Sequence, residues 1–255
     1  MPDEKSLELM KEALSIVEEA KKNKVTLRML GAIAFRTHCH KHEFLYDALA
    51  REISDIDFVG HAEDIEKIEK ILKDFNYESP KGMLGGLTHP DRLIFYNPSR
   101  KITVDVFLDQ LSMCHIIDFK SRLEVDYPTI PLAELLLEKM QIVKINEKDL
   151  KDTTILFLEH DSGSGDNEVI NEKLISSLLS DDWGFYYTVT TNLKKVINYL
   201  STTKIITEPQ KELIEYRIGR LVQAIESHPK SFKWKMRARL GNKKKWYADV
   251  EEVEQ

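Results

Sequence analysis

Three aspartates lie in two short apolar segments of strand-like sequence. Asp55 and Asp57 belong to SDIDF, and Asp105 belongs to ITVDVFLD. Side chains alternate along a strand, so residues two apart share a face and the two aspartates of SDIDF point the same way. Neighbouring carboxylates repel each other unless a cation lies between them or one of them stays protonated. Their oxygens suit a hard divalent cation such as Mg²⁺.

The second segment places its aspartate opposite a clean apolar stripe. That stripe consists of Ile102, Val104, Val106 and Leu108. If the two segments are neighbouring strands, Asp105 completes a three-carboxylate site, and such a site can hold two metal ions about 3.5–4 Å apart for an in-line phosphoryl displacement. The alternative is a set of solvent-facing acids on a half-exposed antiparallel sheet. Aspartate is depleted in strands, which favours the site.

A lysine on the apolar face of a helix is the next candidate. Lys139 shares its face with Leu132, Leu136 and Val143 at steps of three and four residues. A lysine there must extend its ammonium to the rim, pair with an acid, or point at an anion. Asp149 and Asp152 lie one helical turn apart and could position Lys139 or Lys148. The alternative is the ordinary preference for acids in the first turn of a helix.

Hydrophobic periodicity and turn residues predict the helices and strands that carry these residues. VTLRMLGAIAF predicts a strand, a turn at Gly31 and a helix, and NPSR joins RLIFY and KITVDVFLD in a hairpin. Helices are predicted at residues 7–20, 61–75, 131–145 and 148–160, and mostly helices after Val169. The predicted fold class is α/β (α+β). Two domains are expected, 1–160 and 161–255, with their boundary in the Gly- and Ser-rich HDSGSGDNE.

The turn, the paired aspartates and the later aspartate together resemble a known superfamily. The order of these features is similar to the signature of nucleotidyltransferases of the DNA polymerase β type. That signature is a G-G or G-S turn, then h-D-h-D-h, then h-D-h, where h is an apolar residue; here it corresponds to Gly31, SDIDF and TVDVF. Within it, REISDIDF resembles the first motif of the minor nucleotidyltransferase and AbiEii toxin-type group. ELLLEKMQIVKINEKDLKDTTIL resembles that group's later E-K … R/K-D-x-x-D motif. The resemblance covers residues 27–158.

This resemblance implies a fold and a role for each motif residue. The fold would be a nucleotidyltransferase-like mixed sheet flanked by helices, followed by a helical C-terminal domain. Asp55 and Asp57 would bind two Mg²⁺ (or Mn²⁺) ions together with a nucleoside triphosphate (NTP). Asp105 would bind the catalytic metal and help to activate an acceptor hydroxyl.

The nucleotide-binding residues are likewise implied by the resemblance. Gly31 and Ala32 would form the phosphate turn, Lys139 would face the phosphates, and Asp152 would position Lys139. The chain departs from the family pattern at Ala32, which stands where Gly or Ser is usual, and in a longer segment between Gly31 and Asp55.

The expected function is metal-dependent transfer of a nucleoside monophosphate from an NTP to an acceptor hydroxyl, with release of pyrophosphate. The acceptor would be a small molecule, an RNA or a protein, and the resemblance to the toxin-type group adds a cognate antitoxin-like protein as a candidate partner. One alternative is a non-catalytic nucleotide- or partner-binding module that keeps the fold. Another is an unrelated α/β scaffold with surface acids.

Composition excludes several other classes. The 255 residues are 42% hydrophobic and 31% charged, with a net charge of −6, which disfavours a uniformly basic nucleic-acid binder. The two cysteines, Cys39 and Cys114, make no disulfide framework. The first residues lack the apolar core of a signal peptide, and no apolar run approaches the ~18 residues of a membrane span. A cytoplasmic protein without a membrane partner is expected.

Three other segments have weaker signals. Residues 230–245 hold eight cations and no acid, with Trp234 and Trp246 interleaved. They could contact nucleic-acid phosphates with tryptophan stacking, or direct Arg237 or Arg239 to the triphosphate. The favoured interpretation is a helix that is solvated and balanced by the acidic tail, or docked on the acidic N-terminal domain. THCHKH has zinc-ligand types (His38, Cys39, His40, His42) without the usual spacing, so a polar loop is favoured over a metal site. KGMLGGLTH is a turn or a flap over substrate.

Overall fold

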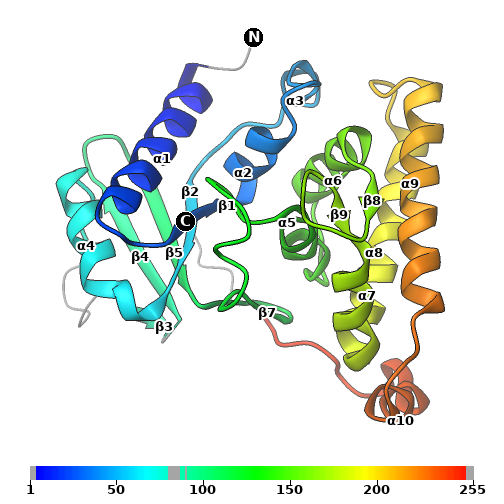
Figure 1. The fold of residues 1–255 in the computed structure, drawn as a ribbon. Coiled ribbons are helices and arrows are strands. Elements are labelled where there is room, and N and C mark those ends of the chain that lie inside the picture. Colours follow the sequence, from blue (N-terminus) through cyan, green and yellow to red (C-terminus); the bar gives the residue numbers. More distant parts are fainter. Residues whose placement is uncertain (1–3, 80–86, 90, 251–255) are drawn as a thin grey trace. The chain divides into compact units, whose positions relative to one another are not determined.

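The computed structural model describes residues 4–79, 87–89 and 91–250. It divides into two compact units (Figure 1). Unit 1 comprises Met1–Leu111 and Ile117–Pro131, and unit 2 comprises Ser112–Ile116 and Leu132–Gln255. The boundary expected after residue 160 therefore lies inside unit 2. The glycine-rich segment KGMLGGLTH falls largely outside the described residues.

A mixed sheet forms the centre of unit 1. Its strands are β1 (Leu27–Leu30), β2 (Ile56–Gly60), β3 (Leu87–His89), β4 (Arg92–Asn97) and β5 (Ile102–Leu108). The described strands are ordered β1-β2-β5-β4-β3. The pair β2–β5 is parallel and the other pairs are antiparallel. The predicted β4–β5 hairpin is confirmed, and the two aspartate-bearing strands are neighbours.

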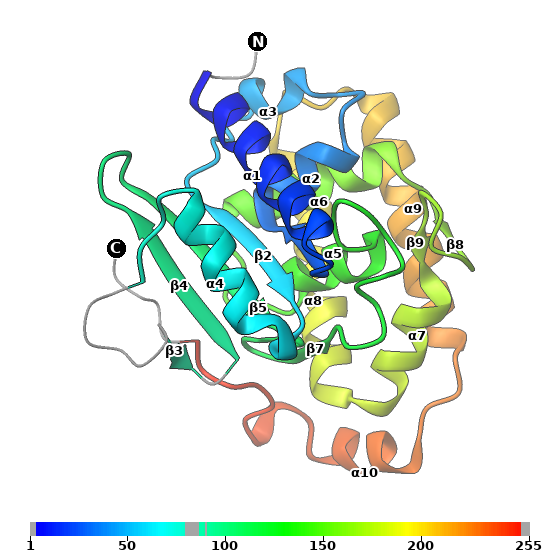
Figure 2. The same ribbon diagram turned by 60° about the vertical axis from the view of Figure 1, so that its left-hand side comes forward.

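Hydrophobic periodicity explains the helices of unit 1. In α1 (Glu4–Lys22), the buried residues include Leu9, Ala13, Ile16 and Ala20, which form one apolar face. In α4 (Ile65–Asp74), which follows the 3₁₀ turn Ala62–Asp64, the buried residues are Ile68, Ile71 and Leu72. These two helices contact each other and lie over the sheet (Figure 2). α2 (Gly31–His38) follows β1 directly, and α3 (Phe44–Ala48) comes next.

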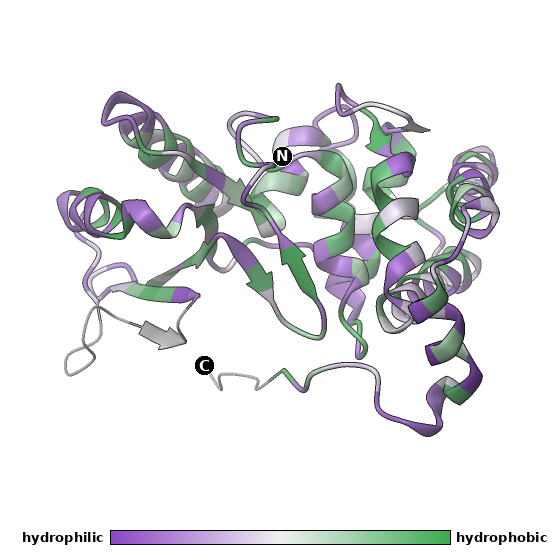
Figure 3. Cartoon of the chain, turned by 60° about the horizontal axis from the view of Figure 1, so that its bottom comes forward, coloured by the Kyte–Doolittle hydropathy of each residue, from purple (hydrophilic) through white to green (hydrophobic). Residues whose placement is uncertain are grey.

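Unit 2 is mainly helical. Its helices are α5 (Leu132–Met140), α6 (Glu147–Glu159), α7 (Glu172–Asp181), α8 (Trp183–Thr202), α9 (Glu208–Ser227) and α10 (Phe232–Leu240), with a 3₁₀ turn at Gly241–Lys243. Side chains of Asn146, Asn171, Asp182 and Ser231 each accept a backbone hydrogen bond at a helix start. Green and purple residues alternate along these helices in Figure 3, as expected when one face packs inward.

Two short strand pairs complete the fold. β6 (Gln110–Ser112) and β7 (Ile116–Asp118) form a hairpin, and β8 (Ser162–Gly163) pairs in parallel with β9 (Ile170–Asn171). The molecule is thus a mixed α/β protein, as the sequence predicts at this level. Within the described ranges, no helix has an apolar stretch long enough to cross a membrane.

Candidate functional site

The site of unit 1 begins where β1 ends. Leu30, the last residue of β1, is the antiparallel partner of Asp57 in β2. The next residue, Gly31, has a φ of +67°, a conformation that L side chains rarely adopt. A Cβ built on Gly31 would lie 2.2 Å from Oδ2 of Asp57. Only glycine therefore lets the backbone approach this carboxylate so closely.

The register of the parallel strands brings two of the predicted acids together. Asp57 of β2 and Asp105 of β5 are direct partners across the parallel pair. Asp55 lies just before β2, and its negative charge raises the pKa of Asp105. All three are partly exposed rather than fully buried. The condition set by the sequence, that the two strands be neighbours, is met.

Asp105 has an arginine partner that the sequence did not reveal. Nη2 of Arg92 on β4 donates to Oδ2 of Asp105 at 2.6 Å. The other carboxylate oxygen, Oδ1, is buried and has no hydrogen-bond partner in the part of the chain that the structure describes. The hairpin register pairs Arg92 with Phe107, so Asp105 lies two residues further along β5 on the same face, within reach of the long arginine side chain. Arg92 is a functional candidate missed by sequence reasoning.

The electrostatics of Asp105 follow from this position. Burial raises its pKa most, the hydrogen bond and charge of Arg92 lower it, and Asp55 raises it again. The net effect is a raised pKa, so ionised Asp105 carries a free-energy cost at neutral pH. A carboxylate oxygen left without a partner, next to two further aspartates, has the donor chemistry of a hard-cation site. However, no group of three or more His, Cys, Asp or Glu residues is arranged to hold a metal ion within the described residues.

This raised pKa predicts how Asp105 affects stability. Asp105 binds its proton more tightly in the folded protein than in the unfolded chain. Its contribution to the free energy of unfolding is therefore fully present below the unfolded pKa of about 3.9 and is lost as the pH rises through the folded pKa. Because asparagine does not titrate, we expect the free energy of unfolding of Asp105→Asn to increase relative to that of the wild type as the pH rises from about 4 to 7. Urea unfolding across this range, without divalent cations, measures the difference. Parallel profiles for the two proteins would contradict the prediction.

Lys139 and Asp152 belong to unit 2, where they come together. Nζ of Lys139 lies 3.2 Å from Asp149 Oδ1, 3.6 Å from Asp152 Oδ2 and 3.5 Å from Glu138 Oε1. Of the three possibilities for a lysine on an apolar face, pairing with acids is the one observed. Asp149 and Asp152 are thus both ion-pair partners of Lys139. Ala32, the second residue of α2 in unit 1, is buried.

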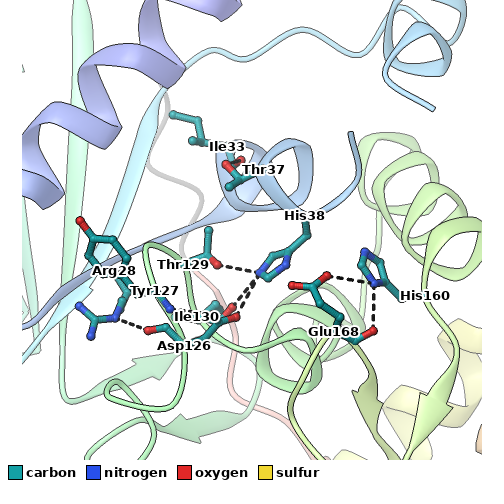
Figure 4. A network of polar contacts seen from close by, with 10 residues as sticks. All are labelled: Arg28, Ile33, Thr37, His38, Asp126, Tyr127, Thr129, Ile130, His160 and Glu168. Carbon is teal, nitrogen blue, oxygen red and sulfur yellow. Dashed lines mark hydrogen bonds and ion pairs between the residues drawn. The ribbon is translucent and has the colours of Figure 1, made fainter. Parts of the chain in front are cut away.

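The histidine-rich segment is partly structural. His38 ends α2 and is buried, with Nε2 2.7 Å from Oγ1 of Thr129 and 3.6 Å from Oδ2 of Asp126 (Figure 4). Cys39 is a fully buried free thiol. His38 thus anchors the end of α2 within unit 1. Figure 4 also draws a pair in unit 2, where Nδ1 of His160 lies 3.7 Å from Oε2 of Glu168.

Comparisons with protein-family models, curated proteins and solved structures find no match for this chain.

Proposed function

We propose that this protein is a metal-dependent nucleotidyltransferase, which transfers a nucleoside monophosphate from an NTP to an acceptor hydroxyl and releases pyrophosphate. One observation carries the proposal: a positive-φ glycine at the end of β1 packs against Asp57, which pairs in register with Asp105 on the parallel strand. Solvent-facing acids on a sheet would not require a glycine packed against one of them. A site in which backbone and carboxylates surround a ligand does require such a glycine, because only glycine allows the backbone to come this close.

The residues divide the work as follows. Asp55, Asp57 and Asp105 would hold Mg²⁺ or Mn²⁺, whose charge neutralises the triphosphate and the leaving pyrophosphate. The acceptor oxygen forms a bond to the α-phosphorus, and the bond from that phosphorus to the bridging oxygen of the pyrophosphate breaks. Asp105, with its raised pKa and unpartnered oxygen, is suited to take the hydroxyl proton. Catalysis of this kind rests on positioning and charge.

One observation favours a second candidate, a non-catalytic nucleotide-binding module. The guanidinium of Arg92 already neutralises Asp105 at 2.6 Å, as a cation would. A protein that had lost catalysis could keep this ion pair in place of a metal. In the enzyme, Arg92 must share or release Asp105 when the cation binds. The two candidates differ in pyrophosphate release, not in NTP binding.

Thermal unfolding with each of the four NTPs tests the proposal. We expect at least one NTP, together with Mg²⁺ or Mn²⁺, to stabilise the protein by about 2.7 kcal/mol at 100 times its Kd. For a chain of this size this corresponds to a rise in Tm of about 5–10 °C. EDTA should remove the shift.

Turnover is tested separately with α-³²P-labelled NTP. Label should appear on an RNA, protein or small-molecule fraction, with one pyrophosphate released for each transfer. Stabilisation without pyrophosphate release in the presence of all three fractions favours the binding module. The lack of a shift with any NTP and metal contradicts both candidates.

A further inference from the structure

The basic C-terminal segment is built around α10, whose inner side packs within unit 2. The ring of Trp234 meets Tyr186 edge-on at 5.1 Å, and the guanidinium of Arg237 lies 4.6 Å from the centre of the Trp183 ring. Arg237 also donates to the carbonyl oxygens of Gly241 and Lys244. The role of Arg237 is therefore structural, which disfavours its proposed contact with a triphosphate.

The segment after α10 is held by its tryptophan. Nε1 of Trp246 donates to Oγ1 of Thr188 at 3.0 Å, and its ring meets Tyr187 edge-on. Gly184 makes room for it, because a Cβ there would lie 2.6 Å from the carbonyl oxygen of Trp246. Trp234 and Trp246 thus fasten this segment onto α8. They are packing residues, which disfavours the tryptophan stacking in one of the alternatives left open by the sequence.

The outer side of α10 is exposed and partly apolar. Phe232, Met236 and Leu240 are 79%, 44% and 51% exposed. They recur every four residues, so they form one row along the helix. All residues of α10 are described, and none of them is buried. The helix therefore presents an aromatic ring and two flexible apolar side chains to its surroundings.

Four cations accompany this row without acidic partners. Lys230 donates to main-chain carbonyls, Lys245 pairs with Asp249, and Lys233 lies 3.8 Å from Asp181. The remaining cations, Lys235, Arg239, Lys243 and Lys244, have no ion pair with any described residue and are exposed. Lys235 and Arg239 are one turn apart on α10, so their charges run beside the apolar row. Lys243 lies in the 3₁₀ turn that follows the helix, and Lys244 comes directly after it.

We infer that this outer face of α10 and the adjoining 3₁₀ turn bind single-stranded nucleic acid. The four cations would contact phosphates, and Phe232 would stack on a base. The convex face of one helix offers no groove for a peptide helix or strand, which disfavours an acidic peptide as the occupant. A protein of net charge −6 would otherwise repel a polyanion, so these unpaired cations supply the local attraction.

Fluorescence anisotropy with a labelled 12-nucleotide RNA of mixed sequence tests this inference on the full-length chain. EDTA is present and NTP is absent, so the outcome does not depend on the proposed nucleotidyl transfer. We compare the wild type with Lys235→Glu/Arg239→Glu. The matched control, Lys173→Glu/Lys194→Glu, makes the same charge change at exposed sites elsewhere in unit 2.

The α10 variant should bind the RNA more weakly than the wild type. The slope of log affinity against log salt concentration should fall by about 0.7 for each phosphate that the protein no longer neutralises, while the control variant retains the wild-type slope.

Phe232→Ala should weaken single-strand binding about 5- to 150-fold and duplex binding little, because stacking needs an unpaired base. The proposal is overturned if the wild type does not bind RNA at 50 mM salt. It is also overturned if the control loses as much affinity, or if polyglutamate of equal charge competes as well as RNA.

Discussion

Asp57→Asn is expected to abolish metal-dependent stabilisation by NTP and to lower nucleotidyl transfer by at least about 10²–10³-fold. The substitution keeps the size of the side chain and removes its charge, and Asp57 lies between Gly31 and Asp105 at the centre of the proposed site. Cation binding depends on the number of carboxylates, so the neutral amide weakens it directly. The change in Tm with NTP and Mg²⁺ measures binding, and release of pyrophosphate measures turnover.

Asp74→Asn is the matched control. Asp74 is the exposed last residue of α4 in the same unit, and its substitution removes the same charge. We expect it to behave as the wild type in both assays. If Asp57→Asn keeps the full metal-dependent NTP shift, the carboxylates do not bind the nucleotide complex and the proposed function fails.

Gly31→Ala is expected to lower both stability and NTP binding. A non-glycine residue in the left-handed region costs about 1–2 kcal/mol, and the added Cβ would meet Oδ2 of Asp57 at 2.2 Å, where overpacking typically costs about 1–3 kcal/mol. A loss of about 2–5 kcal/mol in unfolding free energy follows. Each 1 kcal/mol corresponds to about 2–4 °C in Tm at this chain length. Chemical and thermal unfolding measure the loss.

Gly165→Ala serves as the comparison for glycine removal, because a Cβ there meets nothing within 4 Å. It should leave Tm within about 1–2 °C of the wild type, as surface substitutions usually do. If Gly31→Ala proves as harmless as Gly165→Ala, the close approach of the turn to Asp57 is not a feature of the folded protein. The case for a ligand site at this turn would then lose its main support.

Local patterns predicted the parts of unit 1 that carry the candidate site. Apolar alternation in ITVDVFL identified β5, NPSR identified the β4–β5 turn, and Gly31 identified the change from strand to helix. These features depend on neighbours within a few residues, so a sequence shows them directly. The end of α5 at Met140, rather than near Ile145, shows that helix ends are harder to predict than helices themselves.

Local sequence patterns did not predict the boundary between the two units. HDSGSGDNE has the composition of a linker, yet it contains β8 and leads into β9 inside unit 2. Glycine and serine indicate a turn, but a unit boundary depends on which helices pack together. α5 and α6 contact α8, so they belong with the later helices. Pro128 and Pro131 stand near the actual boundary and are the local signal for it in the sequence.

Residue types and their spacing were enough to find the groups that could do chemistry: a glycine turn, three aspartates on two apolar strands, a lysine on an apolar helix face, and a run of cations without acids. The partners of these groups became known from the folded chain. It paired Asp57 with Asp105, gave Asp105 its arginine, gave Lys139 its acids, and turned Trp234 and Trp246 inward while leaving Phe232 exposed. This difference arises because periodicity fixes which face of an element a side chain occupies, whereas register and packing between distant segments fix what it contacts there.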